Sequence, residues 1–149
     1  MIIVQNKEEL LNSFRTLDRD QVSHLPQGGF PLAMRPYLSW SEPSHHKAFL
    51  LFPHESRPVG AVFRSSQGGG NHAQFCQWCH AVKPPQGIEL LVAQASLKTS
   101  VGVWVCKGIS CKDSMKDPQS NGLREALEPG EKLIRFQLNL QKFVLKNLY

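Results

Sequence analysis

The sequence predicts an α+β fold with a small antiparallel β-sheet, an N-terminal helix and a C-terminal helix. Three observations predict it: two close pairs of cysteines, a series of short apolar runs separated by turn residues, and helical spacing of apolar residues near both ends. The chain has 149 residues, of which 41% are hydrophobic and 19% charged, as in a globular protein with its own core. We therefore expect a single domain over residues 1–149.

The cysteines form two close pairs, Cys76-x2-Cys79 and Cys106-x4-Cys111, and these four are all the cysteines in the chain. Each pair can supply two thiolates from one tight turn, and four thiolates around one ion are typical of structural zinc. The alternatives are ordinary buried thiols or disulfides, and a site in which His80 replaces one cysteine. The pattern favours one structural Zn²⁺ per chain, held by all four cysteines.

Apolar runs predict two hairpins. Residues 48–52 and 59–63 are separated by the polar stretch 53–58, and residues 88–95 and 101–105 lie between the two cysteine pairs. A cysteine knuckle, a hairpin and a second cysteine pair occur in the order expected of a treble-clef zinc finger. We expect the zinc core to cover residues 75–113.

Helical periodicity marks both ends of the chain. Asn6 is a good N-cap for a helix from about Lys7 to Asp18, because Glu9 follows three residues later as in a capping box. Pro129 suits the first turn of a final helix over about residues 129–148. The apolar face of this helix is expected to carry Leu133, Phe136, Leu140, Phe143 and Val144. A polar stripe beside that face would carry Lys132, Arg135, Asn139, Lys142 and Lys146.

The segments between these elements are richer in turn residues. Residues 19–46 contain many Pro, Gly and Ser but also aromatic side chains, so we expect a packed loop with a strand near residues 37–40. Residues 65–71 predict a flexible loop. Leu123 and Leu127 have the spacing of one turn of helix.

The chain is basic, with a formal net charge of +5 and a pI of about 9.2. This balance favours an anionic partner such as RNA, the ribosome or an acidic protein surface. The alternative is an ordinary soluble protein with a modest excess of positive charge. The sequence shows neither a signal peptide nor an apolar stretch of membrane-spanning length, so we expect a cytoplasmic protein, in which thiols stay reduced and bind metal.

The residues do not predict an enzyme. A catalytic zinc keeps one coordination position open for water, whereas four thiolates close the shell. The histidines lack the H-E-x-x-H spacing of zinc proteases and the H-x-E spacing of nucleobase deaminases. We therefore expect no catalytic residues and no small-molecule substrate.

Two groups of side chains are candidates for contact with a partner. Trp78, Lys107 and Lys112 lie beside the cysteines in the sequence. The others come from the final helix: Lys132, Arg135, Lys142 and Lys146. Trp78 could stack on a base or form part of the core, and the lysines could bind phosphates or simply be solvated.

An ordered series of motifs resembles the C-terminal treble-clef zinc-finger domain of the elongation factor G-binding proteins, a family that includes the fusidic-acid resistance proteins of staphylococci. The resemblance covers almost the whole chain. Its motifs are Asn12-Ser-Phe14, Leu38-Ser-Trp40, Phe49-Leu-Leu-Phe-Pro53, Val59-Gly-Ala-Val-Phe-Arg64, Phe75-Cys76-Gln-Trp-Cys79, Leu90-Leu-Val-Ala93, Val101-Gly-Val-Trp-Val-Cys106 and the helix around Arg135, Asn139 and Phe143.

The resemblance implies a non-enzymatic zinc protein that binds elongation factor G and modulates its release from the ribosome. The resistance proteins carry an additional N-terminal helical domain that is not expected in this chain. The alternative function is a zinc-dependent module that binds rRNA or another nucleic acid directly. The two differ in their partner, because direct RNA binding should weaken steeply with salt in the absence of any factor.

Overall fold

The computed structural model describes residues 2–66, 74–116 and 128–149. It divides the chain into two compact units, Met1–Arg64 and Ser65–Tyr149, which are described separately. The expectation of a single domain therefore stays a prediction. Most of the predicted loop at 65–71 and the predicted turn at Leu123 and Leu127 lie outside the described residues. None of the described helices has both the length and the apolar character needed to cross a bilayer.

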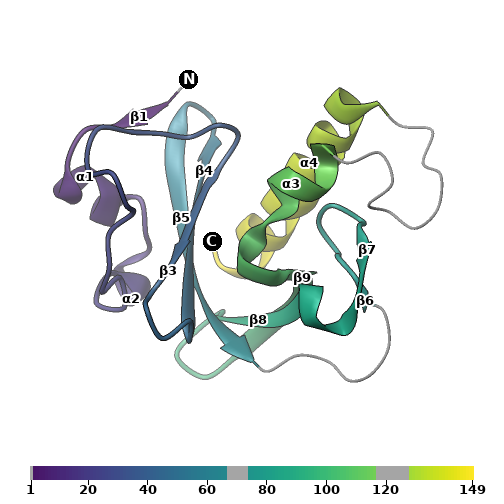
Figure 1. The fold of residues 1–149 in the computed structure, drawn as a ribbon. Helices are drawn as coiled ribbons and strands as arrows, with labels where there is room; N and C mark the ends of the chain where they lie inside the picture. Colours follow the sequence, from purple (N-terminus) through teal and green to yellow (C-terminus); the bar gives the residue numbers. More distant parts are fainter. Residues whose placement is uncertain (1, 67–73, 117–127) are drawn as a thin grey trace. The chain divides into compact units, whose positions relative to one another are not determined.

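The first unit is built on antiparallel strands (Figure 1). Strands β4 (Lys47–His54) and β5 (Arg57–Ser66) pair as the predicted hairpin and extend beyond its predicted ends. Strand β3 (Leu38–Ser41) pairs with the outer edge of β4, which confirms the strand expected near residues 37–40. The short strands β1 (Ile3–Val4) and β2 (Leu32–Ala33) form a second pair.

The first unit has its own hydrophobic core, which explains the aromatic content of the predicted loop. The buried members of the core are Val4, Leu10, Phe14, Leu32, Met34, Phe49, Leu51 and Val62. Trp40 packs against this cluster, with its ring centroid 5.5 Å from that of Phe49 and 6.4 Å from that of Phe14. The indole Nε1 of Trp40 donates a 2.8 Å hydrogen bond to the carbonyl of His24, so the irregular segment is anchored to the core.

The predicted N-terminal helix is wrong in one respect, because it is two short helices, α1 (Lys7–Asn12) and α2 (Thr16–Arg19). The predicted cap is present, since the side chain of Asn6 accepts a 2.9 Å hydrogen bond from the Glu9 amide. The helix breaks after Asn12. There the Ser13 hydroxyl bonds back to the Glu9 carbonyl at 2.9 Å, and the Ser13 carbonyl accepts the Gly60 amide at 2.8 Å. Contact with a strand therefore overrides the local helical pattern.

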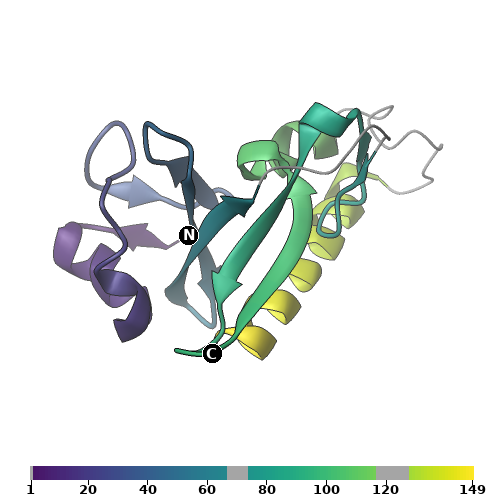
Figure 2. The same cartoon turned by 90° about the horizontal axis from the view of Figure 1, so that it is seen from below.

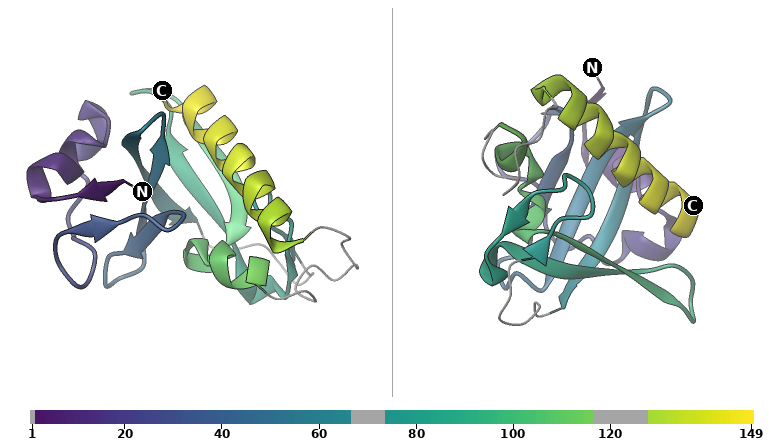
Figure 3. Two further views of the ribbon diagram at one scale, coloured as in Figure 1. Left: turned by 90° about the horizontal axis from the view of Figure 1, so that it is seen from above. Right: turned by 90° about the vertical axis from the view of Figure 1, so that its right-hand side faces the viewer.

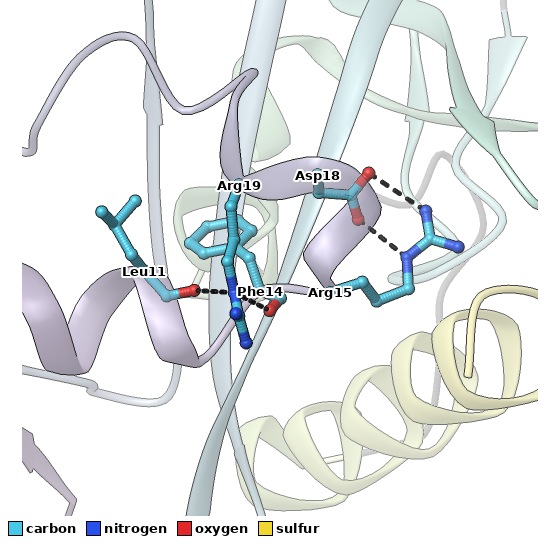
Figure 4. Close-up of polar contacts among 5 residues, drawn as sticks. All are labelled: Leu11, Phe14, Arg15, Asp18 and Arg19. Atoms are coloured by element: carbon cyan, nitrogen blue, oxygen red, sulfur yellow. Dashed lines mark hydrogen bonds and ion pairs between the residues drawn. The ribbon is translucent and has the colours of Figure 1, made fainter.

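Arginine side chains hold the junction between α1 and α2 (Figure 4). The Arg19 Nε donates to the carbonyl of Leu11 at 3.1 Å and to that of Phe14 at 3.2 Å. Both carbonyls lie where the helix is interrupted. The guanidinium of Arg15 makes two hydrogen bonds to the buried carboxylate of Asp18, at 2.8 and 3.1 Å. The Leu11 carbonyl also accepts the Phe14 amide at 3.1 Å, so the Arg19 side chain adds a second donor there and ties the two short helices together. The Arg15 guanidinium pairs the buried charge of the Asp18 carboxylate.

Gly60 is expected to be sensitive to substitution. A Cβ atom at this position would lie 2.8 Å from the ring carbons of Phe14, and the Phe14 ring is itself buried in the core. We expect Gly60→Ala to lower the free energy of unfolding by about 1–3 kcal/mol through overpacking, measured by urea denaturation. As a control, a Cβ atom in Gly102→Ala would lie 3.1 Å from the flexible end of the Leu90 side chain and 3.8 Å from the Leu91 carbonyl oxygen, an ordinary contact, so its effect should be smaller. A fully stable Gly60→Ala would contradict the close packing.

In the described part of the second unit, antiparallel strand pairs combine with the α-helices α3 and α4. Its elements are β6 (Gln74–Phe75), β7 (Val82–Lys83), β8 (Ile88–Gln94), β9 (Ser100–Cys106), α3 (Cys111–Lys116) and α4 (Pro129–Asn147). β8 pairs with β9, and β6 with β7, both antiparallel. Figures 2 and 3 show α4 lying along the β8–β9 hairpin. The predicted hairpin, final helix and α+β class are confirmed.

The buried face of α4 includes one residue assigned to the polar stripe. Phe136, Leu140 and Val144 are buried as predicted, but Lys132 is also only 3% exposed. Four residues make slightly more than one helical turn, so Lys132 lies above Phe136 on the core side. Its assignment to the polar stripe is therefore wrong, while Lys142 and Lys146 are exposed.

Candidate metal centre

The first cysteine pair lies in a tight turn between β6 and β7. The amide of Cys79 points at the Cys76 sulfur, with 3.4 Å between N and Sγ. The His80 amide donates to the Cys76 carbonyl at 2.9 Å, and the Cys76 amide donates to the Ala81 carbonyl at 2.9 Å. His80 has a φ of 64°, a left-handed conformation that lets the chain reverse and brings both sulfurs to one side.

The second pair is delivered by β9 and α3. Cys106 ends β9, a 3-10 turn covers Lys107–Ile109, and Cys111 begins α3. Within this turn Gly108 has a φ of 66°, where glycine is favoured. The carboxylate of Glu89, on β8, accepts the Gly108 amide at 2.6 Å and the Ser65 hydroxyl at 2.5 Å. A buried carboxylate therefore holds the second cysteine turn against the hairpin.

The four sulfur atoms converge. They all lie within 4.8 Å of one another, and all four cysteines are buried and free of disulfides. The Sγ atoms of Cys76 and Cys111 are 3.7 Å apart, and those of Cys79 and Cys106 are 3.5 Å apart. Within the described residues, histidine contributes no ligand atom to this group. The donor set and its closure fit one structural zinc ion in a treble-clef finger, as the cysteine spacing predicts.

Hydrogen bonding among the four sulfur atoms moves the pKa values of the thiols in opposite directions. Hydrogen bonding from Cys106 lowers the pKa of Cys76, and hydrogen bonding from Cys111 lowers the pKa of Cys106. The pKa values of Cys79 and Cys111 are raised, and for both thiols the main cause is the hydrogen bond shared with Cys106. Thiols this close cannot all ionise without a cation between them. Bound Zn²⁺ would supply that positive charge and take all four as thiolates.

Two residues of α4 contact the first cysteine turn directly. The Arg135 Nη2 donates to the Cys79 carbonyl at 3.1 Å. The Asn139 Nδ2 donates to the Trp78 carbonyl at 3.0 Å and lies 3.3 Å from the His80 Nε2. Arg135 and Asn139 are four residues apart, which puts both on one side of the helix. This spacing was the only feature of the sequence that could have indicated their shared contact with the cysteine turn.

The other residues predicted to contact a partner occupy different environments. Trp78 is 1% exposed and packs against Phe136 and Phe143 of α4, with ring centroids 6.4 and 6.0 Å away. The Trp78 ring is thus part of the core of the second unit. Lys107 is exposed in the turn before α3, and Lys112 is partly buried, which lowers its pKa. Lys132 is buried, as described above.

Comparisons with known proteins agree with this geometry. The model of one protein family, the FBP C-terminal treble-clef zinc-finger, matches residues 9–146. The solved structure of the fusidic acid resistance protein FusC superposes with a TM-score of 0.54 and 14% sequence identity, over 88% of this chain and 56% of that chain. At this identity the likeness shows a shared fold, and the chain spans just over half the length of FusC. A search of curated proteins found no match.

Proposed function

Because the chain belongs to the family of FBP C-terminal treble-clef zinc-fingers, we propose that it is a non-enzymatic zinc protein that binds elongation factor G and modulates its release from the ribosome. Membership of this family is the support for elongation factor G as the binding partner. The closed group of four buried thiols supports the absence of catalysis, because zinc held by four sulfurs has no position left for water or substrate.

The observation that carries the proposal is a set of exposed apolar side chains beside the metal centre. Phe75 is 48% exposed and Val82 37%, on the β6–β7 pair, while Ile134 is 59% and Leu138 62% exposed on α4. We call these four residues the knuckle surface. Phe75 stacks on the His80 ring, with centroids 4.9 Å apart, and His80 contacts Asn139 of α4, so the two parts of the surface are connected.

The chemistry of the knuckle surface suits a protein partner. A hollow along α4 is lined by Glu131, Ile134, Arg135, Leu138 and Asn139, so apolar side chains alternate there with polar ones. Protein interfaces combine an apolar centre with a polar rim in this way, and contiguous exposed apolar residues commonly mark such contacts. The surface depends on the metal centre, because its strand pair flanks the first cysteine turn.

The double variant Phe75→Ala/Leu138→Ala tests the surface. We expect its affinity for purified elongation factor G, measured by calorimetric titration of the zinc-loaded protein, to fall at least tenfold, or about 1.4 kcal/mol. Both side chains are exposed, so zinc content and thermal stability should change little. The control is Leu25→Ala, which removes an exposed apolar side chain of the first unit and should bind normally. Unchanged binding by the double variant would exclude the knuckle surface.

Exposed lysines support the alternative of direct rRNA binding. Lys107 is exposed between Cys106 and Cys111, Lys116 is exposed at the end of α3, and Lys142 and Lys146 are exposed on α4. Phosphate contacts would make RNA affinity fall steeply with salt, whereas an interface centred on apolar residues should be less sensitive. Salt-dependent binding of rRNA fragments in the absence of elongation factor G would favour this alternative.

A further inference from the structure

Helix α4 contacts the first cysteine turn at two successive backbone carbonyls. Asn139 donates to the Trp78 carbonyl at 3.0 Å, and Arg135 donates to the Cys79 carbonyl at 3.1 Å. Neither side chain belongs to the group of sulfur atoms. Both nevertheless act on the backbone that carries two of the four cysteines.

The first of these bonds leads to a sulfur atom through a single peptide group. The Trp78 carbonyl and the Cys79 amide belong to the same peptide, and that amide points at the Cys76 Sγ with an N···S distance of 3.4 Å. A donor on the carbonyl polarises the peptide and strengthens its N–H as a donor. Asn139 is therefore connected to the Cys76 sulfur by two hydrogen bonds in series.

The second bond leads to the backbone of the same cysteine. The Cys79 carbonyl, which accepts from Arg135, shares its peptide with the His80 amide, and that amide donates to the Cys76 carbonyl at 2.9 Å. Arg135 also brings a positive charge to a centre where four thiolates on Zn²⁺ would leave a net negative charge.

We propose that Asn139 and Arg135 are positioning residues for the metal centre, so that the docking of α4 sets the zinc affinity of the cysteine turn. An amide N–H aimed at a thiolate stabilises the deprotonated sulfur that zinc requires. Groups that orient metal ligands in this way typically change metal affinity 10- to 100-fold. Because coupling is reciprocal, bound zinc stabilises the docked position of α4 by the same factor.

This coupling connects zinc to the exposed residues of α4. Ile134 and Leu138 each precede one of the two contact residues, Arg135 and Asn139, on the same helix. Zinc would therefore hold the α4 part of the knuckle surface in place beside the β6–β7 part. Only this last consequence depends on the proposed function, whereas zinc affinity and helix docking can be measured without elongation factor G.

The variant Asn139→Leu tests the coupling, with Asn147→Leu as its matched control. Both remove an amide from α4 at similar size, but Asn147 donates to the Phe143 carbonyl of its own helix, at 2.8 Å. In chelator competition, we expect Asn139→Leu to raise the zinc dissociation constant about tenfold or more, and Asn147→Leu to leave it unchanged. A zinc dissociation constant for Asn139→Leu equal to that of the control would overturn the proposal.

Two further measurements separate ligand positioning from loss of fold. In the Co²⁺-loaded protein, the sulfur-to-metal charge-transfer band should shift in Asn139→Leu because the N–H···S bond to Cys76 weakens. It should also shift in Arg135→Met because a positive charge beside the Cys79 carbonyl is lost, and Arg135→Lys should restore part of that second shift. In the wild-type chain, removing zinc should speed amide hydrogen exchange along residues 131–142 of α4. Unchanged exchange in this segment, while residues 76–82 open, would also overturn the proposal.

Discussion

Replacing Cys106 with serine should abolish stoichiometric zinc binding and unfold the metal-binding part of the second unit. Cys106 is fully buried, and its sulfur lies 3.5 Å from that of Cys79. A hydroxyl is a much poorer zinc ligand than a thiolate, and structural zinc contributes on the order of 10 kcal/mol to the folding of small fingers. Hydrogen exchange should rise sharply over residues 75–116, and metal analysis should find almost no zinc.

The damage should be local. The first unit has its own core around Phe14, Phe49 and Val62, so its amides should stay protected in the variant. Ser110→Ala, which leaves all four cysteines in place, is the control and should keep its zinc. Stripping zinc from the wild-type chain with a chelator should reproduce the pattern of the Cys106→Ser variant. Full protection of residues 75–116 without metal would contradict a structural role for zinc.

Trp78→Ala should produce the second-largest loss of stability. The ring is 1% exposed and lies between the cysteine turn and α4, where it packs against Phe136 and Phe143. Truncation of a buried aromatic to alanine leaves a cavity and costs about 3–5 kcal/mol. We expect a loss of this size in urea denaturation of the zinc-loaded protein, together with faster hydrogen exchange in α4.

Phe75→Ala is the control for Trp78→Ala, because Phe75 lies three residues earlier but is 48% exposed. Its effect on the free energy of unfolding should stay within about 0.5 kcal/mol. The two variants thus separate a core role from a surface role on one turn of chain. A stable Trp78→Ala variant that had lost only partner binding would show that the ring serves recognition instead.

The sequence predicted the features that depend on spacing and periodicity. Structural zinc is bound by four ligands in tetrahedral geometry, and two close pairs of cysteines can supply them. The positions of the four cysteines were therefore enough to predict the metal centre. Continuous apolar runs bounded by turn residues predicted both β4–β5 and β8–β9. In β4 and β5 the run reflects burial of successive residues, which needs no alternation, whereas burial along β8 alternates although its sequence is apolar throughout much of its length. Pro129 and the apolar spacing after it predicted α4 almost to its ends.

Features set by contacts between distant residues could not be predicted. The break between α1 and α2 depends on the Gly60 amide reaching the Ser13 carbonyl, and nothing near Ser13 in the sequence announces it. The burial of Lys132 depends on which side of α4 faces the core, a choice that its apolar residues determine only approximately. The same holds for Asn139, whose amide meets a carbonyl 61 residues earlier in the chain.

The residues proposed to bind a partner could likewise be predicted from the sequence only in part. Charge and proximity to the cysteines selected Lys107 and Lys112, but exposure after folding is what makes an interface, and exposure depends on packing. The knuckle surface was missed because Phe75, Val82, Ile134 and Leu138 are apolar and would ordinarily be assigned to a core. Their exposure became visible only when β6–β7 and α4 were placed around the cysteine turn.

The most direct test of zinc-dependent elongation factor G binding is native mass spectrometry of the full chain mixed with purified elongation factor G. We expect a complex of one copy of each protein that carries about one zinc ion in this chain, and its loss when zinc is removed. A zinc-loaded chain that forms no complex at low salt, over micromolar concentrations of both proteins, would contradict the proposed function.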